Sequence, residues 1–174
     1  SWPDCYNDGM SKVSHDSETL AENQQVITAC AFIHREVDGE HQVFLAKRAD
    51  TKKFLPGVHE LPGGHIDFAE DIVAGLKREV DEEFGMKVRI GDPFFVFTYV
   101  NEIKRSHSIE VIYFGQFEGD DSTIVTNPED HSVYGWFAEK DLEQATTNEK
   151  GLDDIEFQGI RKGFALLNGQ APEF

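Results

Sequence analysis

The sequence predicts one α/β domain in which a mixed β-sheet lies between helices, and three observations support this class. The chain has 174 residues, a length that suits a single hydrophobic core. Several apolar segments of strand length are interrupted by one amphipathic helical segment, and a second helical segment follows near the end of the chain. This order of elements is typical of a mixed sheet covered by helices on both faces.

We expect the domain at residues 24–174 and an N-terminal arm at residues 1–23. The arm is polar and acidic and has no hydrophobic stretch, so it does not resemble a secretory signal. Met10 is a candidate native start, which would make residues 1–9 a remnant of protein expression. No apolar run of the chain is long enough to span a bilayer, and we expect a cytoplasmic protein. An arm of this kind can also cross to a second subunit, so a homodimer is a hypothesis.

The charge of the chain limits its partners. There are 33 Asp and Glu residues against 16 Lys and Arg, a formal net charge of -17. This balance argues against binding a nucleic acid polymer or an anionic membrane, because both require a basic face. A small phosphorylated substrate remains compatible, since a bound divalent cation reverses the field inside one cleft. Cys5 and Cys30 permit one disulfide at most, and Cys30 is expected to be a small buried hydrophobe within a strand.

The strands are predicted from β-branched and apolar runs. Residues 25–36 are a buried strand, Asp38-Gly39 is a hairpin turn, and residues 42–48 are the partner strand. Further strands are predicted at residues 94–100, 109–117 and 133–138, and a short helix at residues 140–144. The basic Lys104–Arg105 pair lies in the turn between the first two of these strands.

Two longer helices are predicted from their apolar periodicity. The first spans residues 67–84, because Asp67 and Glu70 match a capping box and Gly85 is a typical C-terminal stop. Its apolar face consists of Ile72, Val73, Leu76, Val80 and Phe84. The second spans residues 153–168, with Ile155, Ile160, Phe164 and Leu167 on or near one face.

An acidic cluster on the first helix is the strongest candidate for chemistry. Glu79, Glu82 and Glu83 fall within a sector of roughly 100° beside the apolar face. Like charges at this spacing repel, and the last turn of a helix disfavours anions. A hard dication such as Mg²⁺, which prefers carboxylate oxygens, would relieve the conflict. The alternative is a solvated acidic face.

The residues around this cluster form an extended pattern: Gly64-x5-Glu70-x7-Arg78-Glu79-Val80-x-Glu82-Glu83-x-Gly85-Met86. The pattern resembles the signature of the Nudix family (MutT-like) at every conserved position of that signature. The resemblance implies a Nudix-type α/β/α sandwich over residues 24–168. It also implies Mg²⁺-dependent hydrolysis, with Mn²⁺ as a substitute, of a phosphoanhydride bond in a nucleoside diphosphate linked to another moiety.

The resemblance also implies roles for individual residues. Glu79, Glu82 and Glu83 would bind the metal together with the backbone carbonyl of Gly63, and Arg78 would orient Glu79. Glu70 would be structural, while Gly64 and Gly85 would serve backbone geometry. Glu79 is the favoured general base, and Glu129 or Asp130 is the competing candidate.

Substrate contacts are predicted with less detail. Arg48 stands in a basic group with Lys47, Lys52 and Lys53 that would meet phosphate, the alternative being solvated loop charges. Phe95 stands among aromatic residues that could stack on a nucleobase or pack in the core: Phe54, Phe95, Phe97 and Tyr99. His59 and His65 flank the turn at residues 61–64 and are further candidates for substrate contact.

Two residues that mark particular substrate classes among the relatives are missing, and their absence limits the range of expected substrates. ADP-ribose-cleaving relatives carry a proline where this chain has Glu102, and dinucleoside-polyphosphate relatives carry a tyrosine that is missing around residues 103–105. These absences favour a nucleoside triphosphate or a nucleotide sugar. Two alternatives are a non-catalytic nucleotide-binding Nudix module and isoprenoid diphosphate isomerase chemistry, for which Cys30 would be the candidate cysteine.

Overall fold

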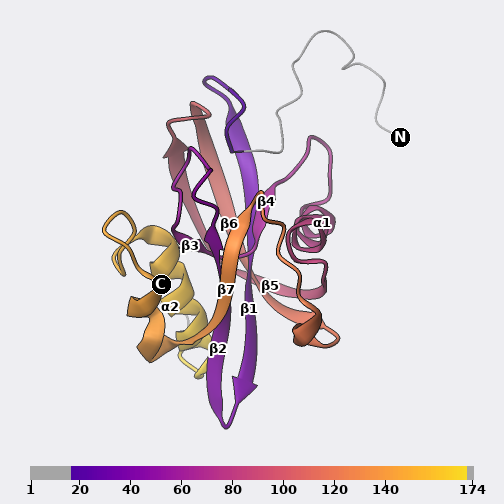
Figure 1. Ribbon diagram of the computed structural model, residues 1–174, viewed down its shortest axis with the longest axis vertical. Coiled ribbons are helices and arrows are strands. Elements are labelled where there is room, and N and C mark those ends of the chain that lie inside the picture. Colours follow the sequence, from indigo (N-terminus) through magenta and orange to yellow (C-terminus); the bar gives the residue numbers. More distant parts are fainter. Residues whose placement is uncertain (1–16, 172–174) are drawn as a thin grey trace.

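The computed structural model describes residues 17–171, and its elements follow the predicted order of strands and helices (Figure 1). The nine strands and α-helices are β1 (Gln25–Val37), β2 (Glu40–Arg48), β3 (His59–Glu60), β4 (Gly63–His65), α1 (Ile72–Phe84), β5 (Lys87–Asn101), β6 (Ser106–Glu118), β7 (His131–Ala138) and α2 (Ile155–Leu167). Short 3-10 helices occupy Asp121–Thr123 and Glu139–Ala145.

The described chain folds into a sheet with one α-helix on each side (Figure 1). Seven strands take part, in the order β3-β2-β1-β6-β5, with β4 paired to β1 and β7 paired to β2. β1 and β6 run parallel, while the remaining pairs are antiparallel. A mixed sheet between helices confirms the predicted α/β/α class.

The first hairpin forms where the sequence predicts it. Asp38 and Gly39 both have positive φ angles, 53° and 81°, and they join Val37 of β1 to Glu40 of β2. Positive φ at both central residues suits the twist of a two-residue hairpin. By contrast, β5 begins at Lys87 rather than at the predicted residue 94, because its pairing with β6 continues through register shifts around Pro93.

The predicted start of the first helix at Asp67 is wrong by five residues. α1 begins at Ile72, and the carboxylate of Asp71 caps it by accepting the Ala74 N–H at 2.9 Å. Glu70 does bond the Asp67 N–H at 2.9 Å, as in a capping box, but Ala69 has a φ of 64° that a helix cannot contain. Gly85 ends the helix as predicted, with a φ of 63° and its N–H donated to the Asp81 carbonyl.

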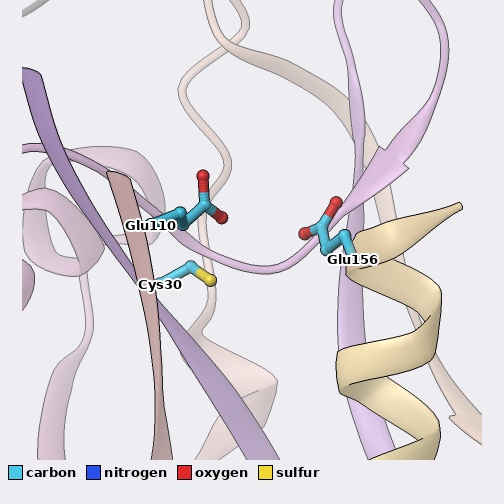
Figure 2. A group of neighbouring side chains, drawn as sticks. All are labelled: Cys30, Glu110 and Glu156. Atoms are coloured by element: carbon cyan, nitrogen blue, oxygen red, sulfur yellow. The ribbon is translucent and has the colours of Figure 1, made fainter. Parts of the chain in front are cut away.

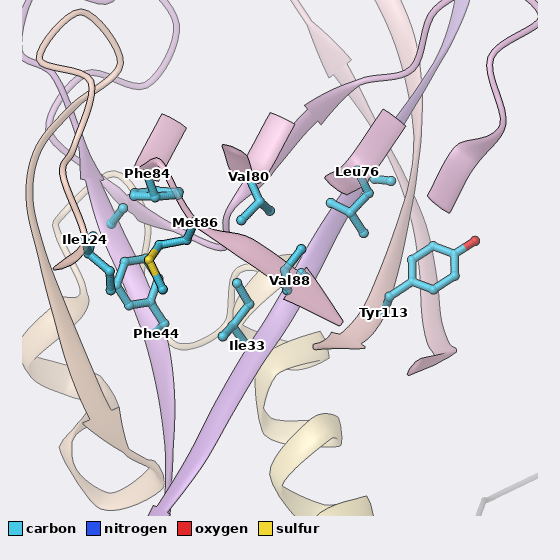
Figure 3. Close-up of a cluster of buried hydrophobic side chains, with 12 residues drawn as sticks. Ile33, Phe44, Leu76, Val80, Phe84, Met86, Val88, Tyr113 and Ile124 are labelled. Atoms are coloured by element: carbon cyan, nitrogen blue, oxygen red, sulfur yellow. The ribbon is translucent and has the colours of Figure 1, made fainter. Parts of the chain in front are cut away.

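A hydrophobic core lies on each face of the sheet. On one face, Leu76, Val80 and Phe84 of α1 pack against the β-sheet residues Ile33 and Phe44 (Figure 3). On the other face, α2 buries Phe157, Ile160 and Phe164, and Phe164 meets Phe32 edge-on at a centroid distance of 5.2 Å. The two helices are therefore held by separate cores, and each presents its polar edge to the region between them.

That region opens because β1 and β2 pair over only part of their length. They are paired where residues 34–37 meet residues 40–43. At its other end, β1 pairs with β4, while β2 pairs with β3 and β7. The separation of the two central strands lets residues from both faces of the sheet reach one space.

Residues 17–23, the described part of the predicted arm, contact the turn between β5 and β6. Ala21 is buried and donates its N–H to the Lys104 carbonyl at 2.8 Å, and the Lys104 ammonium donates to the Thr19 carbonyl at 3.1 Å. Cys5 and Met10 lie outside the described residues, while Cys30 is a buried free thiol. Between residues 17 and 171, no helix has the length and hydrophobicity needed to cross a membrane.

Candidate active site

A cavity of about 370 Å³ is lined by residues from all seven strands and from both α-helices. Glu79 and Glu83 of α1 line it from one side, and the first turn of α2 lines it from the other. The backbone of Gly63 and Gly64 in β4 forms the wall between these groups. The helix predicted to carry metal-binding carboxylates therefore presents two of them to this cavity.

Glu79 is held between an arginine and a glycine. The Arg78 guanidinium donates to Glu79 Oε1 at 2.7 Å, and it also forms a two-pronged bond to Glu70 at 2.9 and 3.0 Å. A Cβ atom added to Gly64 would stand 2.5 Å from Glu79 Oε2, so this carboxylate rests directly on the β4 backbone. The Arg78 guanidinium thus joins Glu79 to Glu70, which anchors the arginine.

Glu83 is buried in a crowded acidic environment. Its Oε2 accepts the Gly63 N–H at 3.1 Å, and its Oε1 lies 4.0 Å from Nδ1 of the buried His131. Burial raises the pKa of Glu83 well above its ordinary value, and the negative charges of Glu60 and Glu79 raise it further. Excess buried negative charge of this kind is what a bound dication neutralises.

Glu60 is a component that the sequence interpretation missed. The Arg48 guanidinium bonds both of its oxygens, at 3.1 and 3.2 Å, and His131 Nε2 lies 2.9 Å from Oε1. Burial would raise the pKa of Glu60, but Arg48 and His131 outweigh it and lower the pKa to about 2. Its place just before the predicted turn at residues 61–64 was the one available signal.

Glu82 differs from the other two predicted metal ligands. Its side chain is 59% exposed, and Glu82 is absent from the described residues that line the cavity. It reaches Arg78 at 3.3 Å, so the arginine links it to Glu79. Asp81 points away from the cavity and pairs with Lys87 at the surface.

The predicted basic group divides in two. Arg48 and Lys52 line the cavity, whereas Lys47 and Lys53 do not contribute to its described wall. Lys52 bonds Asp130 at 2.7 Å, which brings this second candidate base into the same cavity. Glu129 is exposed and lies outside that wall.

The aromatic candidates also divide. Phe54, Phe97 and Tyr99 line the cavity, and the rings of Phe54 and Tyr99 are nearly parallel, with centroids 6.1 Å apart. Phe95 does not line it: this ring packs so closely on α2 that a Cβ added to Gly159 would stand 2.8 Å from it. The core-packing alternative therefore describes Phe95. Of the two histidines, His65 lines the cavity and His59 packs on Phe137.

A second polar cluster lies in the same cavity and was not predicted. It combines Cys30 of β1, Glu110 of β6 and Glu156 of α2 (Figure 2). The Lys150 ammonium pairs with Glu156 and belongs to the same cluster. The available signal was the strand period, because Glu110 alternates with Ile109 and Val111 and so shares the face of the buried Ile112. A charged residue on an inward face often has a functional reason.

The fold and the site define an α/β/α protein whose central helix presents paired carboxylates to a cavity that also holds cationic side chains. The family model described as NUDIX domain matches residues 25–156, which is most of the chain. The chain therefore belongs to the Nudix family, whose enzymes hydrolyse a nucleoside diphosphate linked to another moiety.

Individual relatives agree with this assignment. The protein named Uncharacterized Nudix hydrolase YfcD, from Salmonella typhi, is 30% identical over 89 residues, and the match spans 47% of each chain, about half the length of that relative. A MutT Nudix hydrolase from Burkholderia pseudomallei is 27% identical with a TM-score of 0.59, covering 74% of this chain and 94% of that one. The MutT protein of Methanosarcina mazei shares the fold, with a TM-score of 0.66 and 23% identity over 86% of this chain and 99% of that one.

Proposed function

We propose that the protein is a Mg²⁺-dependent hydrolase that cleaves a phosphoanhydride bond in a nucleoside diphosphate derivative. The substrate class we favour is a nucleoside triphosphate or a nucleotide sugar. One observation carries the proposal: Glu79 and Glu83 face a cavity that also contains the cations Arg48 and Lys52. Carboxylates suit a hard metal ion, and the two cationic side chains suit the phosphates that would accompany it.

The donor set fits Mg²⁺. Glu79, Glu83 and the Gly63 carbonyl would hold the ion, with Glu82 joining if its exposed side chain turns from Arg78 toward the cavity. The raised pKa of Glu83, caused by burial and then by Glu60 and Glu79, supports a cation at this place. When bound, the ion supplies charge neutralisation for the diphosphate and polarises a water, and Mn²⁺ has similar oxygen preferences.

The protein groups would position the substrate and move a proton. Arg48 is bonded to Glu60 and Lys52 to Asp130, so both cations are already oriented toward the cavity. Phosphate oxygens at this place would share the donors of both side chains. Glu79 is our favoured base, because the Arg78 bond and the Gly64 backbone hold its carboxylate in one place. Asp130 is the alternative base, since it lines the cavity and Glu129 does not.

The isomerase alternative gains no support from Cys30. Burial raises the pKa of this thiol well above its ordinary value, and Glu110 and Glu156 raise it further. A reactive cysteine requires the opposite shift, in which the pKa is lowered and the thiolate is favoured.

The homodimer remains a prediction. The molecular mass of the protein in solution, measured by light scattering, tests it.

The test is hydrolysis of a nucleotide panel with Mg²⁺, with products identified by chromatography. The panel contains nucleoside triphosphates, oxidised purine triphosphates, nucleotide sugars, ADP-ribose, dinucleoside polyphosphates and coenzyme A. We expect one class to be cleaved, and Glu79→Gln and Glu83→Gln to lose on the order of 10³-fold in rate. Asp81→Asn is the matched control, because it changes the same acidic run outside the cavity. Binding without cleavage would instead favour a nucleotide-binding module.

A further inference from the structure

The inner part of the cavity holds a polar cluster distinct from the carboxylates of α1. Cys30 Sγ and one oxygen each of Glu110 and Glu156 lie within 4.8 Å of one another. Figure 2 shows these side chains pointing toward a common space from β1, β6 and the start of α2. The Thr28 hydroxyl borders the same space and donates to Glu110 Oε2 at 3.0 Å.

Glu156 is already satisfied by the protein. Its Oε1 accepts the Leu61 N–H at 2.8 Å, and its Oε2 binds the buried Lys150 ammonium. A metal ion at the cluster would have to displace this ammonium. We therefore assign Lys150 and Glu156 a structural role, as a buried ion pair that joins α2 to the turn before β4.

Within this cluster, Glu110 is the described carboxylate that has no ion-pair partner. The two groups that hydrogen-bond its carboxylate, the Thr28 hydroxyl and the Cys30 thiol, are neutral, and the nearby Lys150 is paired with Glu156. Across residues 17–171, Glu110 forms no ion pair. Burial raises the pKa of Glu110 to about 7, and the negative charge of Glu156 adds to the shift. A buried carboxylate without an ion-pair partner gains most from a ligand that brings N–H donors.

An aromatic wall stands beside Glu110. Phe97 lies directly opposite Glu110 in the β5–β6 pairing, and Tyr99 follows two residues later on the same face. Phe54 lies nearly parallel to Tyr99, and all three rings line the cavity. Flat aromatic surfaces beside a hydrogen-bond acceptor suit a heterocycle that stacks by its face and donates from its edge.

We propose that this inner end of the cavity is the subsite for the nucleobase, and that Glu110 selects a base with an amino group over one with a carbonyl oxygen. The proposal rests on the proposed function, because the phosphates of the same ligand would lie at Arg48, Lys52 and the α1 carboxylates. Above its pKa, Glu110 is a carboxylate that only accepts hydrogen bonds, so a carbonyl oxygen would face it acceptor to acceptor. An amino group would instead donate an N–H to it, and this difference favours the amino-bearing base.

The test is equilibrium binding of non-cleavable α,β-methylene nucleoside diphosphates, measured by calorimetry with Mg²⁺. The pairs are the adenosine and inosine forms and the cytidine and uridine forms, compared at about pH 8.5, where Glu110 is ionised. In at least one pair, the amino-bearing member should bind about tenfold or more tightly. Glu110→Gln should reduce that ratio to about one or reverse it, because the glutamine amide can donate to a carbonyl.

Controls locate the effect at the subsite. Glu118→Gln, at the exposed end of the same strand, should leave the ratio unchanged, and Thr28→Val should weaken it by releasing Glu110. Equal affinities in both pairs, an unchanged ratio in the Glu110→Gln and Thr28→Val proteins, or no measurable binding would each overturn the subsite. If the ratio behaves as expected but no nucleotide is hydrolysed, the subsite stands and only the proposed hydrolysis fails.

Discussion

Arg78 donates a hydrogen bond to Glu79 at 2.7 Å, and its other two nitrogens donate to Glu70, so one guanidinium joins the loop before α1 to a carboxylate in the cavity. The same side chain reaches the His65 carbonyl at 3.2 Å. Adjacent bonds to Glu70 and Glu79 also raise the pKa of Arg78, so its charge is secure at any working pH. The position of Glu79 thus depends on a planar group with several donors.

Arg78→Lys should therefore reduce activity although the charge is retained. A lysine ammonium is a point charge and cannot hold Glu70 and Glu79 together in the geometry of the guanidinium fork. We expect hydrolysis to fall about 10- to 100-fold and the Mg²⁺ concentration for half-maximal rate to rise. Arg89→Lys, on the exposed surface of β5, is the matched control. Unchanged metal dependence in Arg78→Lys would contradict the orienting role.

Gly64→Ala should misplace Glu79 without unfolding the protein. Gly64 does not have a positive φ, so alanine fits the backbone, but its Cβ would stand 2.5 Å from Glu79 Oε2. Displacement of a catalytic group by about 1 Å costs on the order of 10²-fold in rate. Gly91→Ala is the control, because its nearest contact is an ordinary 3.5 Å. Melting temperatures and hydrolysis rates of both variants should show the loss in activity for Gly64→Ala alone.

The parts of the site that lie on one helix could be predicted from sequence. Helical periodicity places Glu79, Glu82 and Glu83 in one sector, and the structure brings Glu79 and Glu83 to the cavity while Glu82 stays exposed. The helix start was harder to predict, because Glu70 bonds the Asp67 N–H in the manner of a capping box while Ala69 adopts a positive φ. The capping-box hydrogen bond therefore forms at Asp67 although the helix does not begin there.

The parts that depend on strand pairing could not be predicted. Glu110 lies beside Thr28 only because β1 and β6 pair in parallel in one particular register, and Glu60 meets His131 through the separate pairing of β2. Neither register can be obtained from hydrophobic alternation, which gives the face of a residue and not its neighbour. Phe95 and Phe97 illustrate the limit: both lie on the same face of β5, yet Phe97 lines the cavity and Phe95 packs on α2.

The stability of the ligand-free protein should fall as the pH rises from about 4.5 to 7. Burial and then Glu156 raise the pKa of Glu110 to about 7, above the ordinary 4.5 of an unfolded chain. Between these values the folded state holds a proton that the unfolded state has lost, so raising the pH favours unfolding. Other charged or titratable groups facing Glu110 are Cys30, Tyr99, Lys150 and Glu156.

Urea unfolding at pH 5 and pH 8 measures this dependence. The wild-type midpoint should drop between the two pH values by more than the midpoint of Glu110→Gln, which cannot titrate at this position. Glu118→Gln should behave as the wild type, since that residue is exposed on the same strand. An identical pH response in Glu110→Gln and wild type would mean that other groups account for the dependence.

Lys150→Met should destabilise the fold because it removes the cation that pairs with the buried Glu156 carboxylate. The Lys150 and Glu156 side chains are only 6% and 10% exposed, so removal of the ammonium leaves Glu156 buried without its cation. Breaking a buried pair from one side costs about 3–5 kcal/mol of unfolding free energy. The double variant Lys150→Met with Glu156→Gln should recover part of the loss, because no charge then remains to be desolvated.

Lys140→Met is the control, since its pair with Glu40 is exposed and should contribute nothing measurable to stability. Equal urea midpoints for Lys150→Met and Lys140→Met would show that water reaches Glu156 and that the pair is not structural.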